Sequence, residues 1–181
     1  MSVPSMTRII TRKSQLAMWQ ASWVKKQLIK HFPDLTVKII GTDSLGDIDR
    51  SRPTNEIGGK GVFVKSLQQA LLDHKADIAV HCVKDMSAHP TPDLSLISIP
   101  EREDVRDALI SKNNLPLAKL PAGAVIGTGS PRRSSFLKAY RPDLIISPIR
   151  GNIDSRLNKL RQAHYDAIIL ACAGLRRLNL E

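Results

Sequence analysis

The sequence has few aromatic residues and few cysteines. Two tryptophans, two tyrosines and three phenylalanines make up 4% of its 181 residues, which is little for the stacking surfaces that bind single-stranded nucleic acids. Cys82 and Cys172 lie far apart in the chain and belong to no CxxC pair and no Cys/His cluster. The sequence therefore predicts two free thiols and no metal site, and it disfavours nucleic acid as a partner.

Long apolar runs are also missing. No stretch approaches the roughly 18 consecutive apolar residues that cross a membrane. Residues 1–14 lack the apolar core of a secretory signal. We therefore expect a cytoplasmic protein, a monomer without a membrane partner.

Positive charge is in clear excess and unevenly placed. Lysine and arginine total 27 against 17 acidic residues, a net charge of +10. Residues 130–181 alone hold 10 basic and 4 acidic side chains. Such a field attracts nucleic acids, acidic membranes or small polyanions, and composition does not choose among them.

Short β-branched runs alternate with segments of helical periodicity, which is typical of an α/β fold. Helices are predicted at 15–31, 62–74, 131–140 and 154–163, and a further helix is expected to start at 175. Strands are predicted at 8–11, 35–40, 77–83, 94–99, 108–111, 124–127, 144–149 and 167–171. The long segment 41–61 is expected to be a functional or disordered loop.

A charged connector, PEREDVRD at 100–107, separates two such alternating stretches. It predicts a boundary between an N-terminal α/β domain, residues 1–100, and a second α/β domain, residues 101–181.

Basic residues recur at three corners where a predicted strand ends and a helix begins. The unpaired N–H groups and the dipole of a helix N-terminus favour anions. The first corner is TRKS (11–14), where Ser14 can cap the helix beside Arg12. Taken alone, that serine is more simply explained as a helix cap.

The second corner, TGSPRR (128–133), follows a strand, with Ser130 suited to the N-cap and Pro131 to the first helical position. Cations in a first turn oppose the helix dipole. Arg132 and Arg133 are therefore better explained by a bound anion than by folding alone.

The third corner, RGNIDSR (150–156), has an arginine, a turn glycine, an Asn or Asp cap and a second arginine. Arginine pairs bidentately with carboxylates, so these corners together indicate a ligand with several carboxylates or phosphates. Arg176 and Arg177 form either a fourth corner or an exposed basic pair. Asp85 follows a strand among these cations, where a carboxylate stays ionised and can stabilise a developing cation, although such residues are often simple turn residues.

Six motifs occur in register along the chain: TRKSQLA (11–17), GGKGVFVK (58–65), HCVKD (81–85), GTGSPRR (127–133), RGN (150–152) and YDAIILA (165–171) with AGL (173–175) after it. In order and spacing they resemble the porphobilinogen deaminase (hydroxymethylbilane synthase) family from about residue 7 to residue 181.

The resemblance implies two α/β domains of the periplasmic-binding-protein type flanking a cleft, followed by a third domain. It also implies a transferase of haem biosynthesis that condenses four porphobilinogen molecules into linear hydroxymethylbilane. Each porphobilinogen loses ammonia, and the resulting azafulvenium-like cation is attacked by the free α-carbon of a growing pyrrole chain. The family's primer is a dipyrromethane cofactor, attached to a cysteine of the third domain.

By the same resemblance, Asp85 stabilises the cation and the pyrrole N–H groups, and Lys60 lies at the root of the loop over the cleft. The residues that hold cofactor or substrate carboxylates are Arg12, Ser14, Lys84, Thr128, Ser130, Arg132, Arg133, Arg150, Arg156 and Arg177.

The sequence departs from the family pattern at several places. The third domain and its cofactor cysteine are absent from these 181 residues, so we expect this chain alone to make little or no product. Cys82 stands where the family commonly has serine, and Glu56 stands where relatives often carry lysine. Neither Cys82 nor Cys172 matches the attachment position, and both are expected to be small, partly buried residues. The alternative to an enzyme is a non-catalytic module that binds acidic small molecules.

Overall fold

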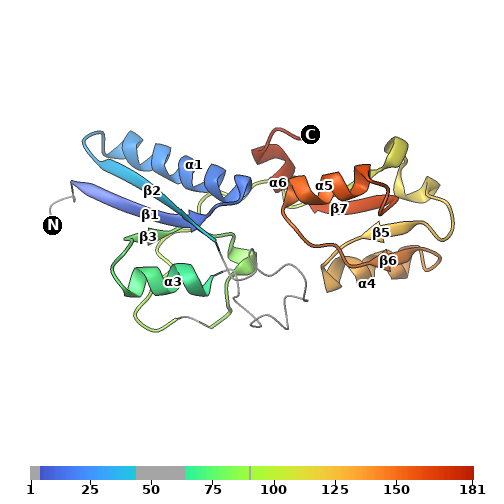
Figure 1. The fold of residues 1–181 in the computed structure, drawn as a ribbon, viewed down its shortest axis with the longest axis horizontal. Coiled ribbons are helices and arrows are strands. Elements are labelled where there is room, and N and C mark those ends of the chain that lie inside the picture. The colour runs from blue at the N-terminus through green and yellow to red at the C-terminus, as the bar shows by residue number, and fades with distance from the viewer. Residues whose placement is uncertain (1–4, 44–63, 90) are drawn as a thin grey trace. The chain divides into compact units, whose positions relative to one another are not determined.

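The computed structural model describes residues 5–43, 64–89 and 91–181. The chain divides into two compact units, Met1–Pro100 and Glu101–Glu181 (Figure 1). Each unit has a β-sheet with helices packed on it, so the predicted α/β class is confirmed.

The first unit is built on a parallel three-stranded sheet in the order β2-β1-β3. Its elements are β1 (Met6–Arg12), α1 (Gln15–His31), β2 (Thr36–Thr42), α3 (Lys65–Leu72), β3 (Ile78–Ala79) and the 3-10 turn η1 (Val83–Asp85). Ile9 of β1 packs with Ala21 of α1, whereas its neighbour Ile10 packs with Leu67 of α3. Because adjacent strand residues point to opposite faces, the two helices cover opposite faces of the sheet (Figure 1).

The second unit has a four-stranded sheet in the order β4-β7-β5-β6, in which only β4 is antiparallel to its neighbour. Its elements are β4 (Asp107–Ser111), β5 (Val125–Gly127), α4 (Pro131–Tyr140), β6 (Ile145–Ser147), α5 (Ile153–Arg161), β7 (Ala167–Ala171) and α6 (Cys172–Arg177), with short 3-10 turns at Lys112–Asn114 and Leu117–Lys119. Ile168 and Leu170 pack with residues of α5 and α6, while Ala167 and Ile169 pack with Leu137 of α4. β7 is therefore buried on both faces.

The predicted helices 15–31 and 131–140 and the predicted strand 167–171 have the bounds of α1, α4 and β7. The strand expected at 77–83 is shorter. Its paired part is only Ile78–Ala79, after which the chain turns into η1.

The strand expected at 94–99 is wrong. Residues 94–99 form no helix or strand, and Leu96, Ile97 and Ile99 are 57%, 74% and 64% exposed. The apolar pattern was there, but a strand also needs a neighbour to satisfy its backbone N–H and C=O groups. In the described part of the chain no strand pairs with this segment.

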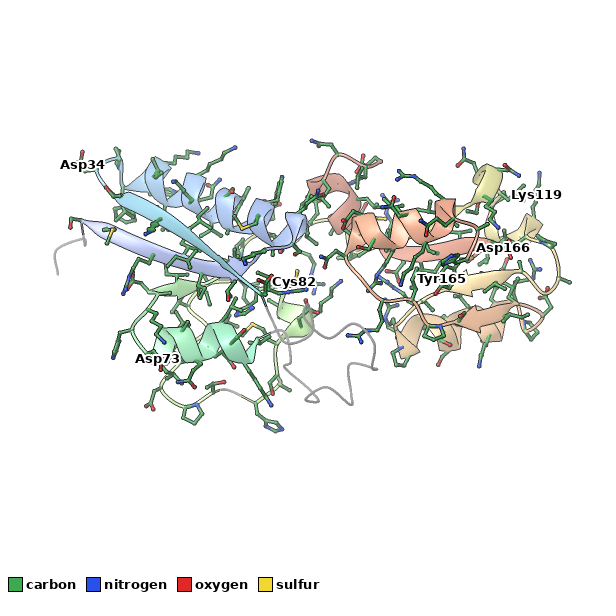
Figure 2. The ribbon with its side chains drawn as sticks, in the orientation of Figure 1. Asp34, Asp73, Cys82, Lys119, Tyr165 and Asp166 are labelled. Atoms are coloured by element: carbon green, nitrogen blue, oxygen red, sulfur yellow. The ribbon has the colours of Figure 1, made fainter. Side chains whose placement is uncertain are left out.

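Asp166 lies just before β7 (Figure 2), where it forms hydrogen bonds toward both neighbouring strands. Its Oδ1 accepts a hydrogen bond from Lys112 Nζ (2.9 Å) just after β4, and its Oδ2 accepts one from the Val125 N–H (2.9 Å) of β5. The Val125 N–H and then the Lys112 ammonium lower the pKa of the Asp166 carboxyl below its ordinary value.

A carboxyl with a lowered folded-state pKa contributes stability that is present above its unfolded pKa, near 3.9, and is lost as the pH falls toward the folded value. We therefore expect Asp166→Asn to lower the free energy of unfolding by about 1 kcal/mol at pH 7. The difference from wild type should shrink below about pH 3, as the wild-type carboxyl becomes protonated. Urea titrations between pH 7 and pH 2 test this, with Asp34→Asn, at an exposed carboxylate, as the control. A difference that stays constant over this range would contradict the expectation.

Candidate anion-binding site

In the first unit, the predicted site residues that the structure describes lie at one edge of the sheet. β1 and β3 are parallel, so their carboxyl ends lie at the same edge. Arg12 is the last residue of β1, and Lys84 and Asp85 lie in η1, soon after β3. Ser14 is the N-cap of α1, and its hydroxyl accepts a hydrogen bond from the Ala17 N–H (3.4 Å), as predicted.

Buried polar groups hold this edge together. The Thr11 hydroxyl is fully buried and lies 3.3 Å from the carbonyl oxygens of both Ala17 and Val80, which connects β1 to α1 and to the residues after β3.

Burial, and then the charge of Arg12, lower the pKa of His81, so its ring is neutral at pH 7. Arg12 and Asp85 are both half-buried, and Lys84 is exposed.

Both cysteines are free and half-buried, as predicted. Cys82 lies beside α1, where its sulfur is 3.3 Å from Gln20 Nε2 and 3.4 Å from Gln20 Oε1 (Figure 2). Cys172 opens α6, and its backbone N–H donates to the Arg106 carbonyl (3.0 Å). The contacts with Gln20 give the Cys82 side chain a packing role.

In the second unit, two glycines allow a close turn after β5. A Cβ on Gly127 would lie 2.9 Å from the Tyr165 ring, and one on Gly129 would lie 3.1 Å from the Ile149 carbonyl oxygen. The Tyr165 hydroxyl in turn donates to the Pro148 carbonyl (2.8 Å), across the turn that follows β6. Because neither glycine has a side chain, the end of β5 and the turn after it can pack closely against Tyr165 and against the backbone after β6.

The hydroxyls of this turn shape the start of α4. Thr128 is buried, and its hydroxyl accepts from the Ser130 N–H (3.2 Å). Ser130 is the N-cap and accepts from the Arg133 N–H (3.5 Å), with Pro131 in the first helical position, as predicted. The Thr128 hydroxyl thus supports the turn from inside.

Arg132 and Arg133 meet an anion of the chain itself. Arg132 Nη2 donates to Asp107 Oδ2 (2.8 Å), and Arg133 Nη2 donates to Asp107 Oδ1 (2.6 Å). This carboxylate offsets the unfavourable position of two cations in a first helical turn. The expectation that a bound anion explains the pair better than folding does is therefore corrected, and their contact with a ligand stays a prediction.

The third corner is closed by hydrogen bonds from α5 to the turn. Gly151 has a φ of +113°, which a residue with a side chain adopts only with strain. Arg156 Nε donates to the Gly151 carbonyl (2.7 Å), and Lys159 Nζ donates to the Arg150 carbonyl (3.2 Å). Asn152 occupies the N-cap position of α5, as predicted, although its side chain makes no capping hydrogen bond.

The two arginines of the possible fourth corner, Arg176 and Arg177, have different surroundings. Arg176 pairs with Asp104 (3.3 Å), Glu103 (3.4 Å) and Glu181 (2.6 Å), and therefore belongs to an internal ion network. Hydrogen bonds from Arg106 hold the pKa of Asp104 far below its usual range, and this carboxylate is only 8% exposed. Arg177 is half-buried at the end of α6.

Within the second unit, the structure brings all of the predicted residues except Arg177 to one edge of the sheet. Thr128, Ser130, Arg132 and Arg133 follow the carboxyl end of β5, and Arg150 and Arg156 follow that of the parallel strand β6. Asp107, which sequence reasoning missed as a site residue, starts the antiparallel β4 opposite Ala171, the last residue of β7. Asp107 is the last residue of the charged connector at 100–107, and this position was the signal in the sequence that could have identified it.

Lys60 and Glu56 lie outside the described residues, as does most of the predicted loop 41–61. Across residues 5–43, 64–89 and 91–181, no group of three or more His, Cys, Asp or Glu side chains could hold a metal ion. Among the helices of those same ranges, none combines the length and apolar character of a membrane span.

Comparison with known proteins gives a family. A family model described as "Porphobilinogen deaminase, dipyromethane cofactor binding domain" matches residues 7–181. This match spans nearly the whole chain.

Several solved structures are similar in fold. They include an ancestral arginine-binding protein bound to glutamine (14% identity, TM-score 0.46, covering 98% of this chain and 75% of that one). The periplasmic VFT2 domain of Bordetella pertussis BvgS is 15% identical, with a TM-score of 0.49 and coverage of 93% and 67%. The periplasmic aliphatic sulphonate binding protein SsuA from Escherichia coli is 16% identical, with a TM-score of 0.48 and coverage of 98% and 58%.

Proposed function

Because the chain belongs to the porphobilinogen deaminase family, we propose that it serves as a hydroxymethylbilane synthase, a transferase that joins four porphobilinogen molecules by deamination and condensation. The observation that carries the proposal is the set of arginines at the carboxyl edge of the second sheet: Arg132, Arg133, Arg150 and Arg156. Each pyrrole carries an acetate and a propionate, so a growing chain is a polyanion. Guanidinium groups match that charge and geometry.

Residues at the edge of the first sheet would carry out the proposed chemistry. Loss of ammonia from the aminomethyl group leaves a cation, and Asp85 is the carboxylate that would stabilise it and accept hydrogen bonds from pyrrole N–H groups. Arg12 and Lys84, which lie at the same edge, would attract the acidic arms of the substrate. Ser14 at the α1 N-terminus adds a hydroxyl and backbone N–H groups for the same arms.

The described residues also suit a dipyrromethane, which the description of the family model names. Arg132 is 62% exposed at the start of α4, so donors of its guanidinium can meet a carboxylate of such a group. Arg133, Arg150, Arg156, Arg177, Thr128 and Ser130 complete the proposed set around the carboxylates of cofactor or substrate. When bound, the cofactor supplies the free pyrrole α-carbon to which the first substrate is joined. The partner that we propose for this chain is porphobilinogen itself, with the chain acting as a cytoplasmic monomer.

Arg132→Ala tests the binding part of the proposal. We expect the dissociation constant for porphobilinogen to rise about tenfold or more, because one charge-assisted contact with a carboxylate is lost. Isothermal titration calorimetry at fixed ionic strength measures this. Arg161→Ala is the matched control, because it removes the same exposed side chain at the far end of α5. Equal weakening by both variants would point to a diffuse charge effect and against the proposed site.

A further inference from the structure

Asp107 is the one acidic residue to which the structure joins both arginines of the α4 corner, among the residues described. It starts β4, and its partner in the antiparallel ladder is Ala171, so its carboxylate lies at the carboxyl edge of β7. Its two oxygens are divided between two guanidinium groups, Oδ1 toward Arg133 (2.6 Å) and Oδ2 toward Arg132 (2.8 Å).

The two arginines are held to different degrees. The Arg133 side chain is only 13% exposed, and besides Asp107 it reaches the Ile169 carbonyl of β7 through Nη1 (3.2 Å). Arg132 is 62% exposed, and its described hydrogen bond is the one from Nη2 to Asp107. Arg133 and the sheet thus fix the carboxylate, and the carboxylate orients the exposed guanidinium.

Asp107 is ionised at neutral pH. Burial by itself raises the pKa of this carboxyl, but the hydrogen bonds from Arg133 and Arg132 outweigh it and lower the pKa below its ordinary value. Two guanidinium groups and one carboxylate leave a net charge of +1 at this corner. The N-terminus of the ten-residue helix α4 adds its partial positive charge to it.

We propose that Asp107 is a positioning residue that holds the Arg132 guanidinium in one orientation at the α4 N-terminus, ready for a carboxylate arm of a pyrrole substrate. This inference rests on the proposed function. Arginine is a flexible side chain, and fixing it only when a ligand arrives costs conformational entropy. Asp107 would fix the Arg132 side chain during folding, so that its conformational entropy is lost before the ligand binds. The remaining N–H donors of the guanidinium would then be available to the ligand.

An opposite role for Asp107 gives the opposite result. If the carboxylate acted mainly as a competing anion, its removal would raise the local charge from +1 to +2 and tighten the binding of acidic ligands. The sign of the change in affinity therefore separates the two roles.

The experiment measures porphobilinogen binding by calorimetry for the wild-type chain, Asp107→Asn, Asp107→Glu, Arg132→Ala and the double variant Asp107→Asn/Arg132→Ala. We expect Asp107→Asn to raise the dissociation constant about tenfold, and Asp107→Glu, which restores the charge, to recover part of the affinity. In the Arg132→Ala background, Asp107→Asn should weaken binding clearly less than in the wild-type background, because only its contact with Arg133 remains to be lost. A merely structural role would weaken binding equally in both backgrounds.

Other outcomes overturn one proposal or both. Wild-type affinity or tighter binding in Asp107→Asn, with Arg132→Ala still weakened, refutes the positioning role and leaves the proposed function standing. Absence of porphobilinogen binding by the wild-type chain refutes the proposed function and this inference with it. Far-UV circular dichroism checks that each variant folds. If Asp107→Asn does not fold, the affinity of Asp107→Glu for porphobilinogen decides between the two roles. A dissociation constant between those of wild type and Arg132→Ala supports positioning, and one equal to or lower than that of wild type refutes it.

Discussion

Asp85→Ala is expected to lower the rate of ammonia release from porphobilinogen by at least about 100-fold, the effect typical of removing a preorganised charge that faces a developing one. Asp85 is the carboxylate of the HCVKD motif, half-buried in the 3-10 turn η1 at the edge of the first sheet. If Asp85 has the proposed role, an alanine there leaves the cation formed by loss of ammonia without its counter-charge. The arginines that we propose to bind the acetate and propionate arms are unchanged in this variant, so the dissociation constant should stay within about threefold of wild type.

Single-turnover conditions, with protein in excess over substrate, measure this step without requiring a complete tetrapyrrole. Asp85→Asn keeps the shape and removes the charge, and it should be nearly as slow as the alanine variant. Asp34→Ala, at an exposed carboxylate after α1, should release ammonia at the wild-type rate. If the chain only binds acidic pyrroles, neither Asp85 variant will alter ammonia release, and the enzymatic proposal fails while the binding alternative stands.

Ile168→Ala is expected to lower the free energy of unfolding of the second unit by about 2–5 kcal/mol, the range for truncating a fully buried aliphatic side chain. Ile168 is 0% exposed in β7, with β4 and β5 as its neighbours in the sheet. It packs with Ile149, Leu160 and Leu175, and Arg150 directly follows Ile149. The cavity left by the truncation would therefore lie beneath the turn that carries Arg150, a residue that we propose to bind the substrate.

Urea denaturation followed by far-UV circular dichroism measures this loss. Ile145→Ala is the matched control, because it truncates the same side chain where it is 54% exposed, and it should cost less than about 1 kcal/mol. Trp19 and Trp23 both lie in α1 of the first unit, so tryptophan fluorescence reports on that unit alone. Equal losses from the two isoleucine variants would show that β7 is not the core of its unit.

Local signals were sufficient for several elements of the fold. The helix over 15–31 has an apolar face together with a serine that caps its first turn, and the helix over 131–140 has both Ser130 and Pro131 at its start. The strand over 167–171 is an unbroken apolar run, as expected for a strand buried on both faces. Each of these patterns is complete within one segment, so no distant residue was needed to predict it.

Pairing between strands could not be predicted in the same way. Residues 94–99 have an apolar strand-like pattern and form no strand, and β3 is paired over only two residues. The hydrogen bonds of a sheet join segments that are distant in sequence. Their extent therefore depends on which neighbour is present, and the pattern of one segment does not contain that information.

The sequence by itself determined the α/β class, the N-cap positions of α1, α4 and α5 and the positions of the basic corners, because each depends on residues within a few positions of one another. Only the tertiary structure decided what those corners contact. Asp107 and Arg132 are separated by 25 positions, and an antiparallel β4 brings the carboxylate to the guanidinium. A pair of arginines that seemed to require an external anion thus has an internal one, since electrostatic partners are chosen by distance in space and not along the chain.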